Sequence, residues 1–187
     1  MLIDLTKKDL PSTIKVGGRS FAIKTCFRDW IAFGRRANTG SLSYDDICEM
    51  FLSEIPPVNM FDDIVEGIIA FYTASSSTPR QSTNADYEAM SDLYEDGEYI
   101  FASFKAQYGI DLLKDDLHWH EFKALLNCLR ETKYNDIISY RAYQKSGESY
   151  EQSMMRLKEA WSLSNVLTAD EANSIEEFER LFEDVEV

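Results

Sequence analysis

Residues 117–129 read LHWHEFKALLNCL, and the apolar side chains of this stretch follow the period of an α-helix. They recur at steps of three and four residues, at Trp119, Phe122, Leu125, Leu126 and Leu129. Either of two preceding acids, Asp115 or Asp116, can cap such a helix by accepting a backbone hydrogen bond. Because a helix with this apolar stripe must bury it against neighbours, the stretch predicts a helical core.

Helical spacing of apolar residues continues on both sides of this stretch. It begins at Cys26, resumes after Ser43, and marks the segments 61–72, 93–108, 134–141, 150–161 and 175–182. In the second of these helices Ser43 can act as the N-terminal cap. We expect the same helix to end at Pro56-Pro57, because proline lacks the backbone N–H that a helix interior needs.

Glycines and caps mark the ends of the later helices. Gly97 is a weak position in the segment 93–108, whereas Gly109 is well placed to stop that helix. Thr168 and Glu171 have the spacing of a capping box, which predicts the start of the last helix. Helices therefore account for most of the expected secondary structure.

A single segment has the pattern of a β-hairpin. Residues 12–16 and 19–24 are short alternating stretches, and Gly17-Gly18 between them accepts the positive φ angles of a tight turn. The expected fold class is mainly α, a helical bundle of about seven helices with a small N-terminal β-hairpin. We expect three regions, namely the hairpin region 1–25, a helical core 26–143 with an exposed polar loop at 75–84, and an acidic helical extension 144–187.

Charge is unevenly distributed along the chain. The 187 residues carry a net charge of -14, but residues 1–36 hold eight Lys or Arg against three Asp, which leaves -19 for the remainder. Affinity for nucleic acid phosphates depends on cationic side chains, so we expect no binding to nucleic acid. The sequence shows no basic-then-apolar leader and no apolar run of spanning length, so we expect a cytoplasmic protein without membrane contact.

No catalytic motif occurs in the sequence, and we predict a protein that is not an enzyme, with no catalytic residue, cofactor or metal. His118 and His120 stand two residues apart, and on a helix they would lie about 200° apart around the axis, too far to share one metal. A buried histidine with a backbone or carboxylate partner is the better interpretation of each. The widely spaced Cys26, Cys48 and Cys128 fit reduced structural residues.

Five segments form a recognisable set: IKTCFRDWIAF (23–33), FY (71–72), DGEYIFASFKAQYGIDL (96–112), LHWHEFKALLNCL (117–129) and IISYR (137–141). Together they resemble the bacteriophage gene-product-fifteen family, small proteins encoded among the tail genes of siphophages and prophages of Gram-positive bacteria. This chain departs from the family pattern at two positions. Cys26 stands where the family has an Asp, and His120 stands where a second aromatic residue is usual.

The resemblance implies a role in tail morphogenesis, by analogy with tail assembly chaperones. These hold the tape measure protein and recruit tail tube subunits before leaving the finished particle. The implied partners are therefore the tape measure protein and the tail tube protein. The implied location is the cytoplasm of the bacterial host, with the protein absent from the mature virion. Because a tape measure is a long helix-rich chain with an apolar stripe, that stripe must be shielded until tube subunits cover it.

Within this interpretation, the candidates for partner contact are Tyr108, Trp119 and Phe122, with His118 and Arg141 as polar neighbours. The alternative is that these residues form the central helix–helix core. We favour the core, because aromatic stripes at helical spacing are usually interior.

Two other functions stay open. The acidic surplus also fits a DNA mimic that inhibits a host nucleic-acid-binding protein, which predicts surface carboxylates in a double row at phosphate-like spacing. A structural tail component that stays in the virion is the second alternative. The stretch from Asp170 to Glu186 holds eight acids and one base, Arg180, beside an apolar face. We expect this terminal helix to dock on its own domain or on another subunit, and the latter would make a homo-oligomer.

Overall fold

The computed structural model describes residues 3–73, 90–145, 147 and 150–163. Within these ranges the chain forms seven α-helices, one 3₁₀ turn and one two-stranded antiparallel sheet, which confirms the predicted fold class. The polar loop predicted at 75–84 and the last helix predicted at 175–182 lie outside the described residues.

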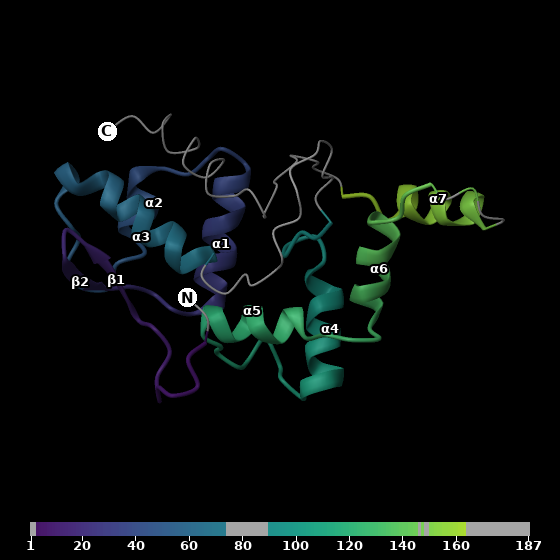
Figure 1. Cartoon of the computed structure of the whole chain (residues 1–187), viewed down its shortest axis with the longest axis horizontal. Coiled ribbons are helices and arrows are strands. Elements are labelled where there is room, and N and C mark those ends of the chain that lie inside the picture. The colour runs from purple at the N-terminus through teal and green to yellow at the C-terminus, as the bar shows by residue number, and fades with distance from the viewer. Residues whose placement is uncertain (1–2, 74–89, 146, 148–149, 164–187) are drawn as a thin grey trace. The chain divides into compact units, whose positions relative to one another are not determined.

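The chain divides into two compact units, shown in Figure 1 with their elements labelled. The described part of unit 1 comprises residues 3–73 and 116–124, and that of unit 2 lies within 90–115 and 125–163. The division predicted from the sequence at residues 25 and 143 stays a prediction. Unit 1 contains β1 (Thr13–Val16), β2 (Arg19–Ala22), α1 (Phe27–Asn38), α2 (Tyr44–Cys48), the 3₁₀ turn η1 (Val58–Met60), α3 (Phe61–Thr73) and the start of α5 (Trp119–Asn127). Unit 2 contains α4 (Gly97–Tyr108), the end of α5, α6 (Lys133–Arg141) and α7 (Glu151–Ala160).

The hairpin of unit 1 forms as its sequence predicts. Gly17 and Gly18 have φ angles of 55° and 79°, which a residue with a Cβ rarely adopts. The strands pair in register with Ile14 opposite Phe21, so both side chains point to the same face and are buried. That face packs on α3 beside Gly67, where an added Cβ would lie only 3.1 Å from Cδ1 of Ile14. The buried face of the hairpin therefore packs on α3 and joins the hairpin to the helices of unit 1 (Figure 1).

The helix α1 begins without a side-chain cap. Cys26 is its N-cap residue, in an extended backbone conformation, and its side chain makes no capping hydrogen bond. An Asp at this position would be among the best N-cap residues, because its carboxylate accepts a free backbone N–H of the first turn. Cys26 therefore leaves the first turn of α1 without the side-chain cap that an Asp would supply.

The structure corrects the predicted extent of α2. Ser43 caps this helix as predicted, in a capping box with Asp46, but the helix ends at Cys48 and not at Pro56-Pro57. The chain after Cys48 instead pairs with the continuation of β2. The N–H of Lys24 donates to Met50 O at 2.8 Å, and the N–H of Leu52 donates to Ala22 O at 3.0 Å. Tertiary pairing therefore ends α2 before the prolines are reached.

The start of α5 also differs from the prediction. The helix begins at Trp119, and neither Asp115 nor Asp116 is its cap. Residues 117–119 are held instead against the chain before α1, where the N–H of Phe27 donates to Leu117 O at 3.0 Å and the N–H of Trp119 donates to Thr25 O at 2.7 Å. These bonds hold the chain extended up to the first residue of the helix.

Unit 2 is built from α4, α6 and α7, with α6 in contact with both of the others (Figure 1). α4 begins at Gly97, so Gly97 is not an interior weak position and Leu93 lies in the preceding turn. Gly109 ends α4 with a φ angle of 72°, as predicted. Thr132 and Asn135 form a capping box at the start of α6.

Candidate functional site

The first turns of α5 bring two large aromatic side chains into the core of unit 1. Trp119 and Phe122 are each 1% exposed. The ring of Trp119 stacks on Tyr72 with centroids 5.2 Å apart and lies 6.4 Å from Trp30. The ring of Phe122 stacks on Phe27 at 4.8 Å. Offset aromatic pairs of this kind stabilise a core beyond the area that they bury.

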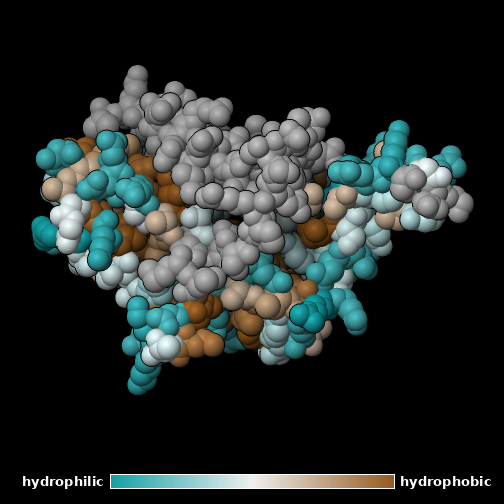
Figure 2. All heavy atoms as spheres, viewed as in Figure 1, coloured by the Kyte–Doolittle hydropathy of each residue, from teal (hydrophilic) through white to brown (hydrophobic). Residues whose placement is uncertain are grey.

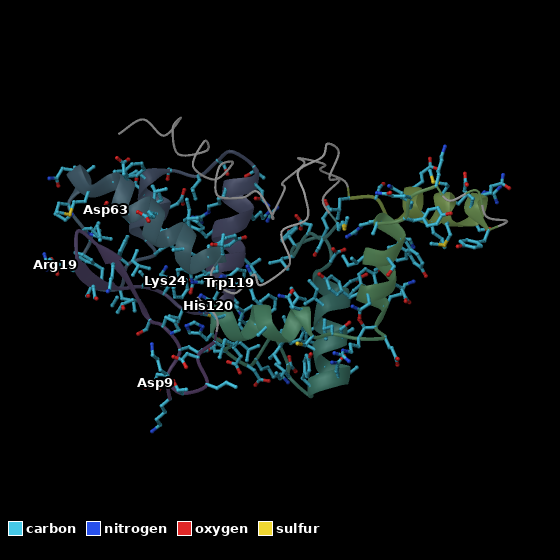
Figure 3. All side chains as sticks on the ribbon, in the orientation of Figure 1. Asp9, Arg19, Lys24, Asp63, Trp119 and His120 are labelled. Carbon is cyan, nitrogen blue, oxygen red and sulfur yellow. The ribbon has the colours of Figure 1, made fainter. Side chains whose placement is uncertain are left out.

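The same turns of α5 cap the C-terminal end of α3. The last carbonyls of a helix have no partner within the helix and need donors from elsewhere. Nε2 of His120 donates to Phe71 O at 2.8 Å, and Nε1 of Trp119 donates to Tyr72 O at 3.0 Å. Nζ of Lys123 also donates to Tyr72 O, at 3.2 Å. Hydrogen bonds therefore connect the FY segment at the end of α3 to the HWHEFK segment at the start of α5. Figure 3 labels Trp119 and His120 at the start of α5.

The two histidine rings lie side by side, which corrects the prediction from helical spacing. His118 precedes α5, in a β-bridge with Cys26, so the expected angle around a helix axis does not apply. The ring centroids are 5.0 Å apart. Nδ1 of His118 accepts from the N–H of His120 at 3.0 Å, and Nε2 of His118 lies 2.8 Å from Pro11 O. Because a carbonyl oxygen only accepts, Nε2 of each ring carries the proton, and the predicted backbone partners are confirmed.

Burial keeps both imidazoles neutral. It lowers the pKa of His118 below the usual value, and it lowers the pKa of His120 to about 4. The neighbouring His118 contributes to the lowered pKa of His120, after the larger effect of burial. Both ring nitrogens of His118 are occupied by hydrogen bonds, so at neutral pH this ring positions the chain and has no free nitrogen for proton transfer.

Replacing His120 with Phe should make the stability of the protein less sensitive to acid. The pKa of His120 is lower in the folded chain than in the unfolded chain, so the unfolded chain binds more protons and stability falls as the pH drops from 7 toward 4. The loss between pH 7 and pH 5 should be about 2 kcal/mol for this group. Urea unfolding at both pH values measures it, and an unchanged pH dependence in His120→Phe would contradict the assignment.

Unit 2 contains a buried ion pair between α4 and α6. Asp96 precedes α4 and is 1% exposed, and Arg141 ends α6 and is 7% exposed. The guanidinium donates two parallel bonds to the carboxylate, from Nη1 to Oδ2 at 2.7 Å and from Nη2 to Oδ1 at 2.8 Å. Its Nε donates to Trp161 O at 2.7 Å, and Nη1 also donates to Met90 O at 3.0 Å. The pair therefore joins α4 to α6 and to the chain on either side of them.

Tyr108 also has a structural position in unit 2. Its hydroxyl donates to Leu125 O at 2.9 Å, and its ring packs edge-on against Phe104 with centroids 5.5 Å apart. Burial raises the pKa of Tyr108, so the hydroxyl keeps its proton and acts as a donor. Of the five candidates, His118, Trp119 and Phe122 lie together in unit 1, and Tyr108 and Arg141 belong to unit 2.

The sequence contains one signal for the ion pair, and it comes from Arg141. Arg141 falls at helical spacing from Tyr134 and Ile137, on the stripe that α6 buries. An Arg on a buried stripe requires a carboxylate nearby, because an unpaired buried charge is strongly destabilising. Its partner, Asp96, is 45 residues away in the chain, and the sequence around Asp96 does not distinguish it from the other acids as the partner of Arg141.

The described residues contain no group of three or more His, Cys, Asp or Glu side chains that could hold a metal ion. Among the helices of the same ranges, none combines the length and the apolar composition needed to cross a bilayer. Two clusters of polar side chains have been described, the cap that α5 makes on α3 and the ion pair of Asp96 with Arg141. In both, the polar side chains bond to backbone carbonyls or to each other. Their geometry supports the positioning of helices.

The chain matches the family model described as Bacteriophage Gp15 protein over residues 6–163. No curated protein and no solved structure matches the chain. The matched range includes both clusters: the cap that α5 makes on α3, and the pair of Asp96 with Arg141. Each cluster joins two of the segments that carry the sequence resemblance.

Proposed function

We propose that this chain, which belongs to the family of Bacteriophage Gp15 proteins, acts without catalysis in phage tail morphogenesis as a tail assembly chaperone. The family match over residues 6–163 is the observation that carries the proposal. The partners would be the tape measure protein and the tail tube protein. The chain would act in the cytoplasm of the host and would leave before the particle is complete.

The charge and the fold support this proposal. A chaperone of this kind must cover the apolar stripe of a long helical partner and keep the complex from self-associating. A net charge of -14 favours such a complex through repulsion between copies. A helical protein also offers side chains at the spacing at which another helix can pack.

Co-expression with the tape measure protein of the same phage tests the proposal. We expect the tape measure protein to stay in the soluble fraction and to co-purify with this chain, and to precipitate when expressed alone. An unrelated acidic helical protein of similar size is the control. A tape measure protein that precipitates equally in the presence and absence of this chain would refute the chaperone role.

The same phage particles distinguish a chaperone from a retained tail component. A chaperone is absent from purified virions, whereas a structural component is present at a fixed ratio to the tube protein. We expect mass spectrometry of purified virions to find no peptide of this chain, and its detection at a fixed ratio would favour the structural alternative.

The described surface gives the DNA-mimic alternative no support. Such a mimic needs rows of carboxylates free of basic neighbours. Several acids are instead paired with Lys or Arg: Glu54 with Arg19, Asp116 with Arg28, Asp46 with Arg36, and Asp111 with Lys105. This interleaving lowers the local negative potential that a DNA-binding protein would recognise.

A further inference from the structure

The helix α7 of unit 2 differs from the other described α-helices in its burial. Each of the others contains at least one buried residue, whereas α7 contains none. Its large apolar residues, Met154, Met155 and Leu157, are half-buried. In the face drawn in Figure 2, hydrophilic residues cover much of α7. Apolar burial therefore contributes less to the attachment of α7 than to that of the other helices.

The residue that follows α7, Trp161, makes polar contacts with both ends of α6. Its carbonyl oxygen accepts from Nε of Arg141, the last residue of α6, at 2.7 Å. Nζ of Lys133, the first residue of α6, lies over the ring of Trp161, 4.8 Å from the centroid, and 5.2 Å from the centroid of Tyr140. Tyr99 of α4 packs edge-on against the same indole at 5.6 Å. We call the contacts of Trp161 with Lys133 and Arg141 the Trp161 latch.

The contacts of the Trp161 latch are weak compared with a buried core. Lys133 is exposed, and a cation over a ring at an exposed site contributes little stability. The bond from Arg141 to Trp161 O replaces bonds that both groups would make with water, so its net contribution is modest. Beyond the latch, Leu163 adds one buried side chain. Release of α7 should therefore require much less free energy than unfolding of unit 2.

We propose that α7 is a detachable helix and that the Trp161 latch controls how often it leaves α6. The folded chain then has two states, one with α7 packed on α6 and one with that face of α6 uncovered. In both states α4 and α6 stay joined by the pair of Asp96 and Arg141. The proposal concerns unit 2 alone and goes beyond the chaperone role.

Native-state hydrogen exchange of the full chain, measured amide by amide by NMR, tests the detachment. A helix of ten residues is not stable alone in water, so α7 should lose its helical hydrogen bonds when it leaves α6. The protection factors of the α7 amides should be at least about a hundredfold lower than those of α4 and α6, and low urea concentrations should hardly change them. Equal protection of α6 and α7, with the same urea dependence, would overturn the proposal, because both helices would then open in one event.

Substitutions of Lys133 test the latch. Lys133→Gln removes the charge over the indole and should lower the protection factors of α7 about fivefold, whereas Lys133→Arg keeps a cation there and should change them less than about twofold. The matched control is Lys114→Gln, which removes a cation of unit 2 that pairs with Asp111 and should leave α7 unchanged. If Lys133→Gln has no more effect on α7 than Lys114→Gln, the latch is wrong.

Trp161→Ala removes the indole but keeps the carbonyl that Arg141 binds. It should lower the protection factors of α7 by about tenfold or more and leave those of α4 and α6 unchanged. Adding Lys133→Gln to Trp161→Ala should change α7 further by less than about twofold, because the ring beneath the cation is already gone. Equal loss of protection in α4, α6 and α7 would show that Trp161 belongs to the core of unit 2 and would overturn the detachable helix.

Discussion

Replacing Arg141 with Met is expected to destabilise unit 2 by about 3–5 kcal/mol. The substitution leaves the carboxylate of Asp96, 1% exposed, without a cation in a site that water does not reach. It also removes the donors to Trp161 O and Met90 O. Urea unfolding measures the total loss. Amide hydrogen exchange should show that the loss of protection is concentrated in α4 and α6.

The surface pair of Arg19 and Glu54 provides a matched control for this substitution. There, too, an Arg contacts both oxygens of a carboxylate, but the side chains are 65% and 60% exposed. Arg19→Met should therefore cost less than about 1 kcal/mol. The double variant Asp96→Asn, Arg141→Met should lose less stability than the sum of the two single variants. Each single variant leaves one buried charge without its partner, whereas the double variant removes both charges. If Arg141→Met is no more costly than Arg19→Met, Arg141 is not a structural residue, and its candidacy as a partner contact gains weight.

Replacing Trp119 with Ala is expected to destabilise unit 1 by about 3–5 kcal/mol. The change removes the ring that stacks on Tyr72 and Phe122, and it removes the indole donor to Tyr72 O at the end of α3. Trp119→Phe keeps a ring but not the donor, so its cost should be smaller, near the roughly 1 kcal/mol of one buried hydrogen bond plus the packing change. Hydrogen exchange in α1 and α3 is the measurement that locates the effect.

The Trp119 variants also separate a core role from a partner role. A residue of the core lowers stability when it is truncated, and any loss of binding follows from unfolding. A residue that contacts a partner lowers binding with little change in stability. We expect Trp119→Ala to follow the first pattern. Full stability together with lost co-purification of the tape measure protein would show that Trp119 contacts the partner.

The sequence alone determined the elements whose signals are local. The hairpin turn depends on Gly17 and Gly18, whose positive φ angles are a property of the two residues themselves. The cap at Ser43 and the stop at Gly109 depend on contacts within one turn of the helix. Periodicity located the seven described helices for the same reason, since neighbours three and four residues apart share a face. The family followed from the same local segments.

Only the tertiary structure decided which of these segments meet. α2 ends early and α5 starts late because backbone groups far apart in the chain pair with each other, an outcome that no local signal contains. The bonds of His118 to Pro11, His120 to Phe71 and Arg141 to Asp96 span 107, 49 and 45 residues. Apolar spacing shows that a side chain is buried but not what it meets there. Burial of a polar group then requires a partner, and only packing selects which one.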